Sequence, residues 1–187
     1  ALGQIGSELT QTLRKMYGES NVIASDIRNE ATDGIYEVHD CTDADRTAEL
    51  VGKHKIDTIY NLPALLSATA EAKPQLAFQI NLIGLFNTLE VAREYNCAVF
   101  TPSTIGAFGE STPKVNTPQD TIMRPSTMYG VTKVAGELLC DYYYKRFGVD
   151  TRGVRFPGII SNKTLPGGGT TDYAVEIYYE AVKHNAY

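Results

Sequence analysis

The sequence predicts an α/β protein in which helices cover both faces of a parallel sheet. Short apolar runs alternate with stretches of helical periodicity along the chain, and the first two runs each end in an acidic residue. The length of 187 residues, with 43% hydrophobic and 21% charged residues, is typical of one globular domain. Together these observations favour a doubly wound sheet over an all-helical or all-strand fold.

The elements follow from the pattern in chain order. A first helix is expected directly after Gly6, with an apolar face that includes Leu9 and Leu13. Apolar runs predict strands at residues 21–26, 35–40, 56–60, 98–100 and 150–156. Helical patterns predict helices at residues 43–54, 72–95, 129–147 and from 172 onward, with a Pro-rich loop at about 111–125. Strands separated by helices imply right-handed crossovers, which make the sheet parallel.

Composition and charge exclude several classes of function. The formal net charge of −5 leaves no basic stripe, which argues against nucleic acid or a membrane as a partner. No apolar run approaches the roughly 20 residues that span a bilayer. Cys41, Cys97 and Cys140 are widely spaced and form no CxxC pair, so we expect neither a disulfide framework nor a metal site. A reducing cytoplasm, or an organelle of similar redox poise, fits these free cysteines best.

Two glycines and an acidic residue suggest a dinucleotide site. Gly3 and Gly6 precede the first helix, where a close backbone approach and the helix N-terminus suit a pyrophosphate. Asp26 ends the next predicted strand, 20 residues after Gly6, where a carboxylate can accept hydrogen bonds from both ribose hydroxyls. A carboxylate there repels a 2′-phosphate and favours NAD, although Arg28 leaves NADP as an alternative.

Tyr129 and Lys133 are the strongest candidates for catalysis. They are four residues apart on a predicted helix, so the phenol and the ammonium share one face. A nearby positive charge lowers the pKa of a tyrosine, and the phenolate can then take the proton of an alcohol. The alternative is an exposed pair of side chains at a helix start.

Ser103 and Thr104 supply hydroxyl groups at the end of the predicted strand 98–100. Ligands of parallel sheets bind at the carboxyl ends of the strands. These hydroxyls are therefore placed to hold a substrate oxygen in line with the phenol of Tyr129, and the sequence does not decide which of them dominates. The alternative is a hydroxyl-containing turn that ends the strand.

The order of these motifs resembles the extended short-chain dehydrogenase/reductase family. The matching features are the two glycines, the strand-end Asp26, residues 61–64 (Asn-Leu-Pro-Ala), Asn81, Ser103-Thr104 and the pair Tyr129/Lys133. Residues 64–68, 102–109, 156–161 and 166–174 further resemble the short-chain type of L-threonine 3-dehydrogenases. The resemblance extends over essentially the whole chain.

This resemblance implies a Rossmann-type fold and oxidation of L-threonine to 2-amino-3-oxobutanoate with reduction of NAD. It implies that Tyr129 acts as the base, that Lys133 orients the nicotinamide ribose, and that Ser103 and Thr104 bind the reacting hydroxyl. The implied cofactor contacts are Gly3, Gln4, Ile5, Gly6, Asp26, Ile27, Arg28, Asp40, Cys41, Leu62, Pro63, Ala64, Asn81, Tyr129, Lys133, Phe156 and Ile159. The implied substrate contacts are Ser67, Ser103, Thr104, Tyr129, Gly169, Thr170 and Thr171. Amide groups at the start of the last helix are suited to the substrate carboxylate.

The predicted organisation is an NAD-binding domain at residues 1–160, lacking its first strand, and the start of a substrate-binding region at residues 161–187. We therefore expect a piece of a longer protein. The family resemblance implies a homodimer formed through the helix at 129–147. Two other functions stay open: a nucleotide-sugar epimerase or dehydratase, and a protein that binds NAD(P) without turnover.

Overall fold

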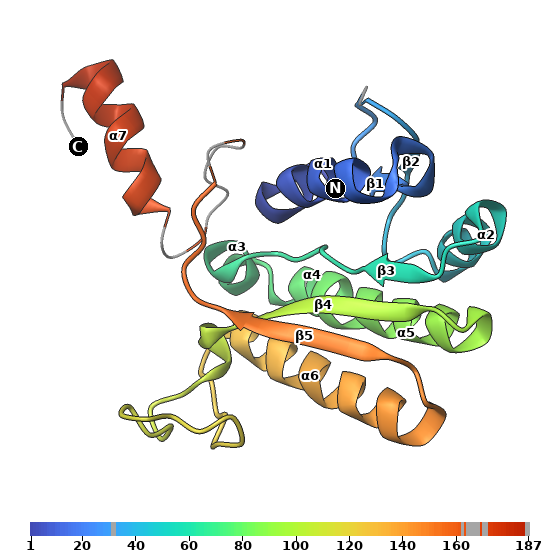
Figure 1. Ribbon diagram of the computed structural model, residues 1–187. Coiled ribbons are helices and arrows are strands. Elements are labelled where there is room, and N and C mark those ends of the chain that lie inside the picture. Colours follow the sequence, from blue (N-terminus) through green and yellow to red (C-terminus); the bar gives the residue numbers. More distant parts are fainter. Residues whose placement is uncertain (31–32, 162, 164–168, 170–171, 186–187) are drawn as a thin grey trace. The chain divides into compact units, whose positions relative to one another are not determined.

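The computed structural model describes residues 1–30, 33–161, 163, 169 and 172–185. The chain forms two compact units, one made of Ala1–Asp40 with Gly158–Tyr187, and one made of Cys41–Pro157. Figure 1 shows that helices and strands alternate along the chain. The predicted boundary between residues 160 and 161 stays a prediction, and each compact unit is described by itself below.

The first unit contains a two-stranded parallel sheet. Its described elements are α1 (Gln4–Tyr17), a 3-10 turn (Glu19–Asn21), β1 (Ala24–Asp26), β2 (Tyr36–Val38) and α7 (Tyr173–His184). The register of the two strands pairs Ala24 with Tyr36 and Asp26 with Val38. Both strands lie inside the predicted ranges and are shorter, because only three residues of each are paired.

The second unit contains a three-stranded parallel sheet of order β3-β4-β5. Its helices are α2 (Ala44–His54), α3 (Ser67–Ala72), α4 (Pro74–Phe78), α5 (Gly84–Tyr95) and α6 (Met128–Phe147). Its strands are β3 (Thr58–Tyr60), β4 (Ala98–Thr104) and β5 (Thr151–Phe156). Helices α5 and α6 pack against one face of this sheet (Figure 1). The predicted α/β class and parallel pairing are confirmed.

The core of the second unit lies between β4 and helices α5 and α6. Leu89 of α5 and Val99 of β4 are almost completely buried, and Tyr143 of α6 packs beside them. Full burial of such apolar side chains contributes about 1.5–3 kcal/mol each. The Tyr143 hydroxyl donates a hydrogen bond to Glu90, so its polar end is satisfied inside this core. The packing fixes α6, the helix that carries Tyr129 and Lys133.

The helical stretch predicted over residues 72–95 is confirmed from Pro74 to Tyr95, with a break at its start and a π-turn in its middle. Lys73 interrupts the helix after α3, and Pro74 begins α4 at a position where its missing N–H is not needed. A π-turn at Gln79–Ile83 then separates α4 from α5. Such a turn inserts one extra residue into the helix, and it is held here by side-chain contacts that sequence periodicity does not reveal.

Strand β4 is longer than the predicted 98–100, because it continues through Pro102 to Thr104. β3 pairs with β4 only as far as Tyr60 and Phe100, whereas β5 pairs with it up to Thr104. The Phe100 carbonyl accepts from the Asn61 amide, so the backbone polar groups of Phe100 face β3. Every second residue of a strand faces the same neighbour, so those of Pro102 also face this side, beyond the end of β3. The missing N–H of Pro102 therefore breaks no sheet hydrogen bond.

Across the part of the chain that the structure describes, no helix has the length and apolar character needed to cross a membrane.

Candidate active site

Tyr129 and Lys133 lie in the first turns of α6, with their side chains on one face. Thr127 caps this helix, since its side chain accepts from the Gly130 amide at 3.1 Å. The Lys133 Nζ atom lies 5.7 Å from the centre of the Tyr129 ring and donates to the Pro102 carbonyl at 2.8 Å. Residues that are far apart in sequence, on α6 and at the end of β4, are thus brought together.

Burial controls the protonation of both side chains. It lowers the pKa of Lys133 to about 8. Burial also raises the pKa of Tyr129, and a hydrogen bond with the Thr104 side chain only partly offsets this effect. Lys133 donates to the Pro102 carbonyl with its ammonium 5.7 Å from the centre of the Tyr129 ring, and the expected lowering of the Tyr129 pKa by this charge stays a prediction.

Thr104 and Ser103 are neighbours in sequence with different partners. The Thr104 hydroxyl oxygen accepts from the Gly106 amide at 3.0 Å, which leaves its proton for the Tyr129 oxygen. Ser103 is buried, and its hydroxyl donates to the carboxylate of Glu137 on α6. A Cβ atom at Gly106 would lie 3.4 Å from the Thr104 hydroxyl oxygen and 3.7 Å from the Tyr129 ring, so of the two hydroxyls Thr104 is the one beside the tyrosine.

A close approach of two backbones sets the position of Tyr129. A 3-10 helix at Ile105–Ala107 follows β4, and its Gly106 carbonyl reaches the start of α6. A Cβ atom at Gly130 would lie 2.4 Å from that carbonyl oxygen and 2.5 Å from the Pro125 side chain. Only glycine fits at position 130, and the contact holds the end of β4 beside the first turn of α6.

Asn81 joins the π-turn to α6 and to the chain that follows β3. Its side chain accepts from the Leu65 amide at 2.7 Å and donates to the Leu65 carbonyl at 3.1 Å. The same amide group donates to the Thr132 hydroxyl at 3.3 Å, and Thr132 is 1% exposed. Asn81 thus braces the backbone just before α3, which begins at Ser67. The predicted cofactor role of Asn81 and the substrate role of Ser67 stay predictions.

Of the other predicted cofactor contacts of the second unit, four lie at or just beyond the ends of its strands, and Cys41 lies before α2. Leu62 and Ala64 are partly buried and Pro63 is exposed, just beyond β3. Phe156 ends β5 and is partly buried. Cys41 is buried, and its sulfur packs so closely that a Cβ atom at Gly84 would lie 2.7 Å from it. The side chain of Cys41 is therefore used in packing, its carbonyl accepts from the Asn87 side chain at 3.4 Å, and its cofactor contact stays a prediction.

The first unit carries the predicted dinucleotide residues at the start of α1. Gly3 is exposed, and a Cβ atom at Gly6 would lie 2.4 Å from the Ala1 carbonyl oxygen, so the turn requires glycine. Within this described turn, no side chain caps α1, and its first turn carries no acidic residue. The helix N-terminus is therefore suited to an anionic pyrophosphate.

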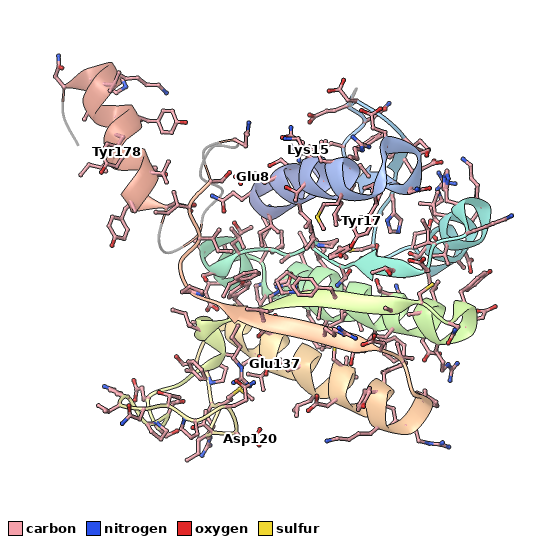
Figure 2. All side chains as sticks on the ribbon, in the orientation of Figure 1. Glu8, Lys15, Tyr17, Asp120, Glu137 and Tyr178 are labelled. Carbon is pink, nitrogen blue, oxygen red and sulfur yellow. The ribbon has the colours of Figure 1, made fainter. Side chains whose placement is uncertain are left out.

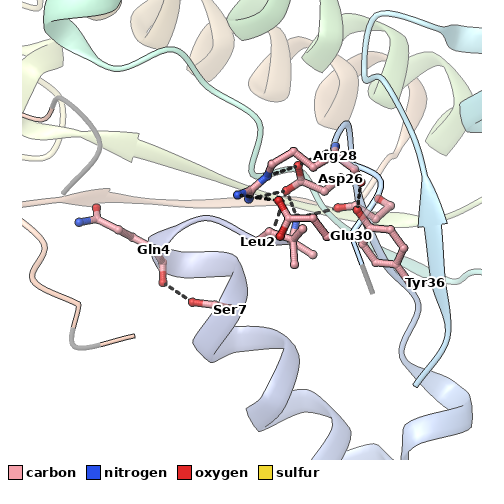
Figure 3. Close-up of polar contacts among 9 residues, drawn as sticks. Leu2, Gln4, Ser7, Asp26, Arg28, Glu30 and Tyr36 are labelled. Carbon is pink, nitrogen blue, oxygen red and sulfur yellow. Dashed lines mark hydrogen bonds and ion pairs between the residues drawn. The ribbon is translucent and has the colours of Figure 1, made fainter. Parts of the chain in front are cut away.

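Asp26 lies at the end of β1, where Figure 3 shows its contacts. Its carboxylate accepts from the Leu2 amide at 2.9 Å and from the Arg28 Nε atom at 3.1 Å. Burial acts to raise the pKa of Asp26, but these hydrogen bonds, together with one from the Ala1 nitrogen, lower it well below the usual range. An ionised carboxylate held beside the Gly3–Gly6 turn fits the ribose of a dinucleotide.

The remaining predicted contacts of the first unit are less constrained. Gln4 and Ile5 begin α1 and are partly buried, Ile27 and Asp40 are exposed, and Ile159 is partly buried. The Gly169 amide donates to the Asp172 carboxylate at 2.7 Å, which ties Gly169 to the start of α7, and its substrate contact stays a prediction. Thr170 and Thr171 lie outside the described residues.

Two residues beside the site were not predicted from the sequence. Glu137 of α6 accepts the Ser103 hydrogen bond and forms an ion pair with Arg155 of β5, with Nη2 and Oε2 2.7 Å apart. Glu137 follows Lys133 by four residues, the same spacing that relates Lys133 to Tyr129. That repeated spacing was the available signal, because it places all three side chains on one face of a helix.

Known proteins resemble this chain over nearly its full length. An uncharacterized epimerase/dehydratase of Staphylococcus aureus (strain USA300) is 61% identical over all of this chain and 60% of its own length. The L-threonine dehydrogenase of Clostridium difficile matches 98% of the chain and 59% of its own chain, at 62% identity and a TM-score of 0.93. The L-threonine dehydrogenase of Phytophthora infestans matches 97% of this chain and 59% of its own chain, at 53% identity and a TM-score of 0.94.

The chain spans about three fifths of the length of the relatives it matches. Their close structural similarity confirms the predicted Rossmann-type fold. The family model described as the NAD dependent epimerase/dehydratase family matches residues 1–178. The strand-end Asp26, the glycine turn and the pair Tyr129/Lys133 thus have a common explanation: this chain belongs to the NAD-dependent epimerase/dehydratase family, and its cofactor is NAD.

Proposed function

We propose that the protein oxidises the 3-hydroxyl of L-threonine to 2-amino-3-oxobutanoate, with transfer of a hydride to NAD. The observation that carries this proposal is the arrangement of Thr104, Tyr129 and Lys133, in which a hydroxyl, a phenol and a buried amine meet. The similarity to two L-threonine dehydrogenases supports threonine as the alcohol.

The roles of the residues follow from their contacts. NAD, when bound, supplies the ring that accepts the hydride from the carbinol carbon. Tyr129 takes the hydroxyl proton as its phenolate, and the Thr104 hydroxyl stabilises that charge by donating a hydrogen bond. Lys133, held by the Pro102 carbonyl, supplies positive charge beside the ring and binds the nicotinamide ribose. The alcohol thus loses one proton and one hydride, which balances the oxidation.

Recognition of the rest of the substrate is proposed for residues outside this group. Ser67 at the start of α3 and the segment Gly169–Thr171 are proposed to contact the amino acid. Gly3 to Gly6 and Asp26 are proposed to bind the pyrophosphate and the ribose of NAD, where an anion is suited to the helix N-terminus and a diol to a carboxylate.

The test is to mix the full-length protein with NAD and L-threonine and follow the absorbance of the reduced cofactor. Threonine-dependent formation of NADH is the expected result, with L-serine and L-allo-threonine as controls for substrate recognition. Conversion of a nucleotide sugar without any reaction of threonine would reject the proposal in favour of an epimerase or dehydratase. Tight NAD binding without turnover of any of these substrates would instead indicate a protein that senses the cofactor.

A further inference from the structure

A largely buried cluster of three polar side chains lies beside Thr104 at the end of β4. Arg155 donates from Nη2 to one Glu137 oxygen at 2.7 Å and from Nε to the other at 3.0 Å. Ser103 donates its hydroxyl proton to the same carboxylate. The side chains of Arg155 and Glu137 are only 15% and 22% exposed, so the pair is shielded from solvent. Figure 2 labels Glu137 on α6.

This cluster joins the three elements that surround the site. Ser103 of β4 and Arg155 of β5 are direct partners in the parallel register, and the next pair is Thr104 with Phe156. Glu137 reaches both strand ends from α6. Because strand residues alternate between faces, a side chain that fixes Ser103 on one face also fixes Thr104 on the other.

Arg155 has a second set of contacts in the segment between β4 and α6. Its Nη1 atom donates to the Gln119 carbonyl at 2.9 Å, and its guanidinium lies 5.5 Å from the centre of the Phe108 ring. This segment leads directly into Tyr129. The guanidinium therefore contacts the chain before Tyr129, at Phe108 and Gln119, and after it, at Glu137, with the planar, forked geometry that lysine lacks.

The charge of Glu137 is maintained by its partners. Burial acts to raise the pKa of its carboxyl, but the hydrogen bonds from Arg155 and Ser103 lower it below the usual range. Because the single hydroxyl proton of Ser103 is used in the hydrogen bond to this carboxylate, Ser103 cannot also donate a hydrogen bond to a substrate oxygen. A hydroxyl that must donate to the phenol or to a substrate is then supplied by Thr104 alone.

We propose that Glu137 and Arg155 are positioning residues, which act through Ser103 to hold the Thr104 hydroxyl against the Tyr129 hydroxyl. This inference deepens the proposed function and rests on it for its kinetic part. In this arrangement Ser103 contributes to placement of the strand end, and Thr104 is the hydroxyl that takes part in the reaction.

The test is a double-mutant cycle in the full-length enzyme with S103A, E137Q and S103A/E137Q. We expect E137Q to lower kcat by about tenfold or more, because small misplacements of a reacting group have large effects. The Kd for NAD should change by less than about twofold, and the double variant should be no slower than E137Q, since both changes remove one interaction. Additive losses in kcat would overturn the proposal, as would an equal weakening of NAD binding.

Conservative and control variants separate positioning from folding. R155K keeps the positive charge but cannot donate two parallel hydrogen bonds to the Glu137 carboxylate. Its kcat should therefore fall nearly as far as that of E137Q. R152Q removes the exposed ion pair between Arg152 and Asp150 on the same strand, and its kcat should match that of the wild type. A similar loss of kcat in R152Q would show that any disturbance of β5 has this effect, and would overturn the proposal.

A spectroscopic readout keeps the proposal testable if the protein does not oxidise threonine. The Tyr129 titration is obtained from the ultraviolet difference between each variant and the same variant carrying Y129F. E137Q should raise the pKa of Tyr129, because the displaced Thr104 hydroxyl no longer stabilises the phenolate. An unchanged titration would overturn the positioning role, whereas absence of threonine oxidation by the wild type rejects only the proposed function.

Discussion

At the scale of single residues, Thr104 and Lys133 show how burial determines what a side chain can do. Thr104 uses its oxygen to accept from Gly106 and keeps its proton for Tyr129. Lys133 is bonded to the Pro102 carbonyl, and its burial disfavours the charged form. Lys133 was predicted from its spacing to Tyr129, and Thr104, together with Ser103, from its place at a strand end, but their donor and acceptor roles depend on backbone atoms that the sequence does not identify.

Replacement of Tyr129 by phenylalanine tests the proposed base. Y129F removes the group that accepts the hydroxyl proton and leaves the ring in place, so kcat with threonine should fall about a hundredfold or more. Steady-state kinetics on the full-length protein measure the change. Y142F, a substitution at an exposed tyrosine of the same helix, is the control and should keep normal activity. A Y129F enzyme with undiminished kcat would show that another group takes the proton.

The pKa of Lys133 predicts a pH dependence of stability. Burial lowers this pKa from 10.5 to about 8, so between these pH values the unfolded chain binds more protons than the folded one. The contribution of Lys133 to the free energy of unfolding therefore rises with pH across this window, by about 3 kcal/mol in total. K133M should remove this rise, which urea denaturation at several pH values would measure without NAD. Parallel curves for K133M and the wild type would contradict the prediction.

At the scale of elements, the start of α6 is fixed by contacts that a single methyl group would disturb. Gly130 lies against Gly106 and Pro125, and this approach sets the distance between the end of β4 and Tyr129. The ion pair of Glu137 and Arg155 holds the same strand end about two turns further along the helix. The geometry of the site is therefore a property of the junction between β4 and α6.

An alanine at position 130 tests this junction. G130A should lower the free energy of unfolding by about 1–3 kcal/mol, because its Cβ atom collides with backbone. Thermal or urea denaturation measures the loss. G52A is the matched control, since a Cβ atom at Gly52 of α2 meets Tyr95 at an ordinary 3.5 Å and should add about 0.5–1 kcal/mol of stability. Equal effects of the two substitutions would show that the close approach does not matter.

Most elements of the fold could be predicted from apolar periodicity, and the exceptions have physical causes. The π-turn at Gln79–Ile83 is held by Asn81, whose partners at Leu65 and Thr132 are distant in sequence. β4 continues through Pro102 because β3 ends first, which depends on how the strands pair. The candidate pair Tyr129/Lys133 follows from spacing, and Ser103 and Thr104 follow from their place at a strand end. Glu137 shares the spacing of that pair, but its contact with Arg155 depends on how α6 packs beside β5.

At the scale of the whole molecule, α5 and α6 present apolar side chains to solvent. Phe86 of α5 and Leu138 and Tyr142 of α6 are 40%, 60% and 52% exposed. Exposed apolar groups on adjacent helices are suited to an interface, and the resemblance to short-chain dehydrogenases implies a homodimer through this region. The dimer stays a prediction, and these side chains are the ones we expect it to bury.

Charges placed on this face test the predicted dimer. L138K/Y142K should convert a dimer into monomers, because burial of two unpaired ammonium groups is costly. Sedimentation velocity of the full-length protein measures the association. V115K, at a side chain that is 79% exposed in the segment between β4 and α6, is the control and should leave the mass unchanged. A dimer that survives L138K/Y142K would place the interface elsewhere.

Pro102 has a further consequence for how the sheet is kept from growing. A strand that offers both N–H and C=O groups invites any extended chain to pair with it, including one from another molecule. Beyond Phe100, β4 carries no N–H at position 102, and its carbonyl is occupied by Lys133. An extended chain that docked beside Thr104 would find no donor at position 102 and would compete with Lys133 for the carbonyl. Pro102 and the Lys133 ammonium thus disfavour the addition of a further strand at this end of β4.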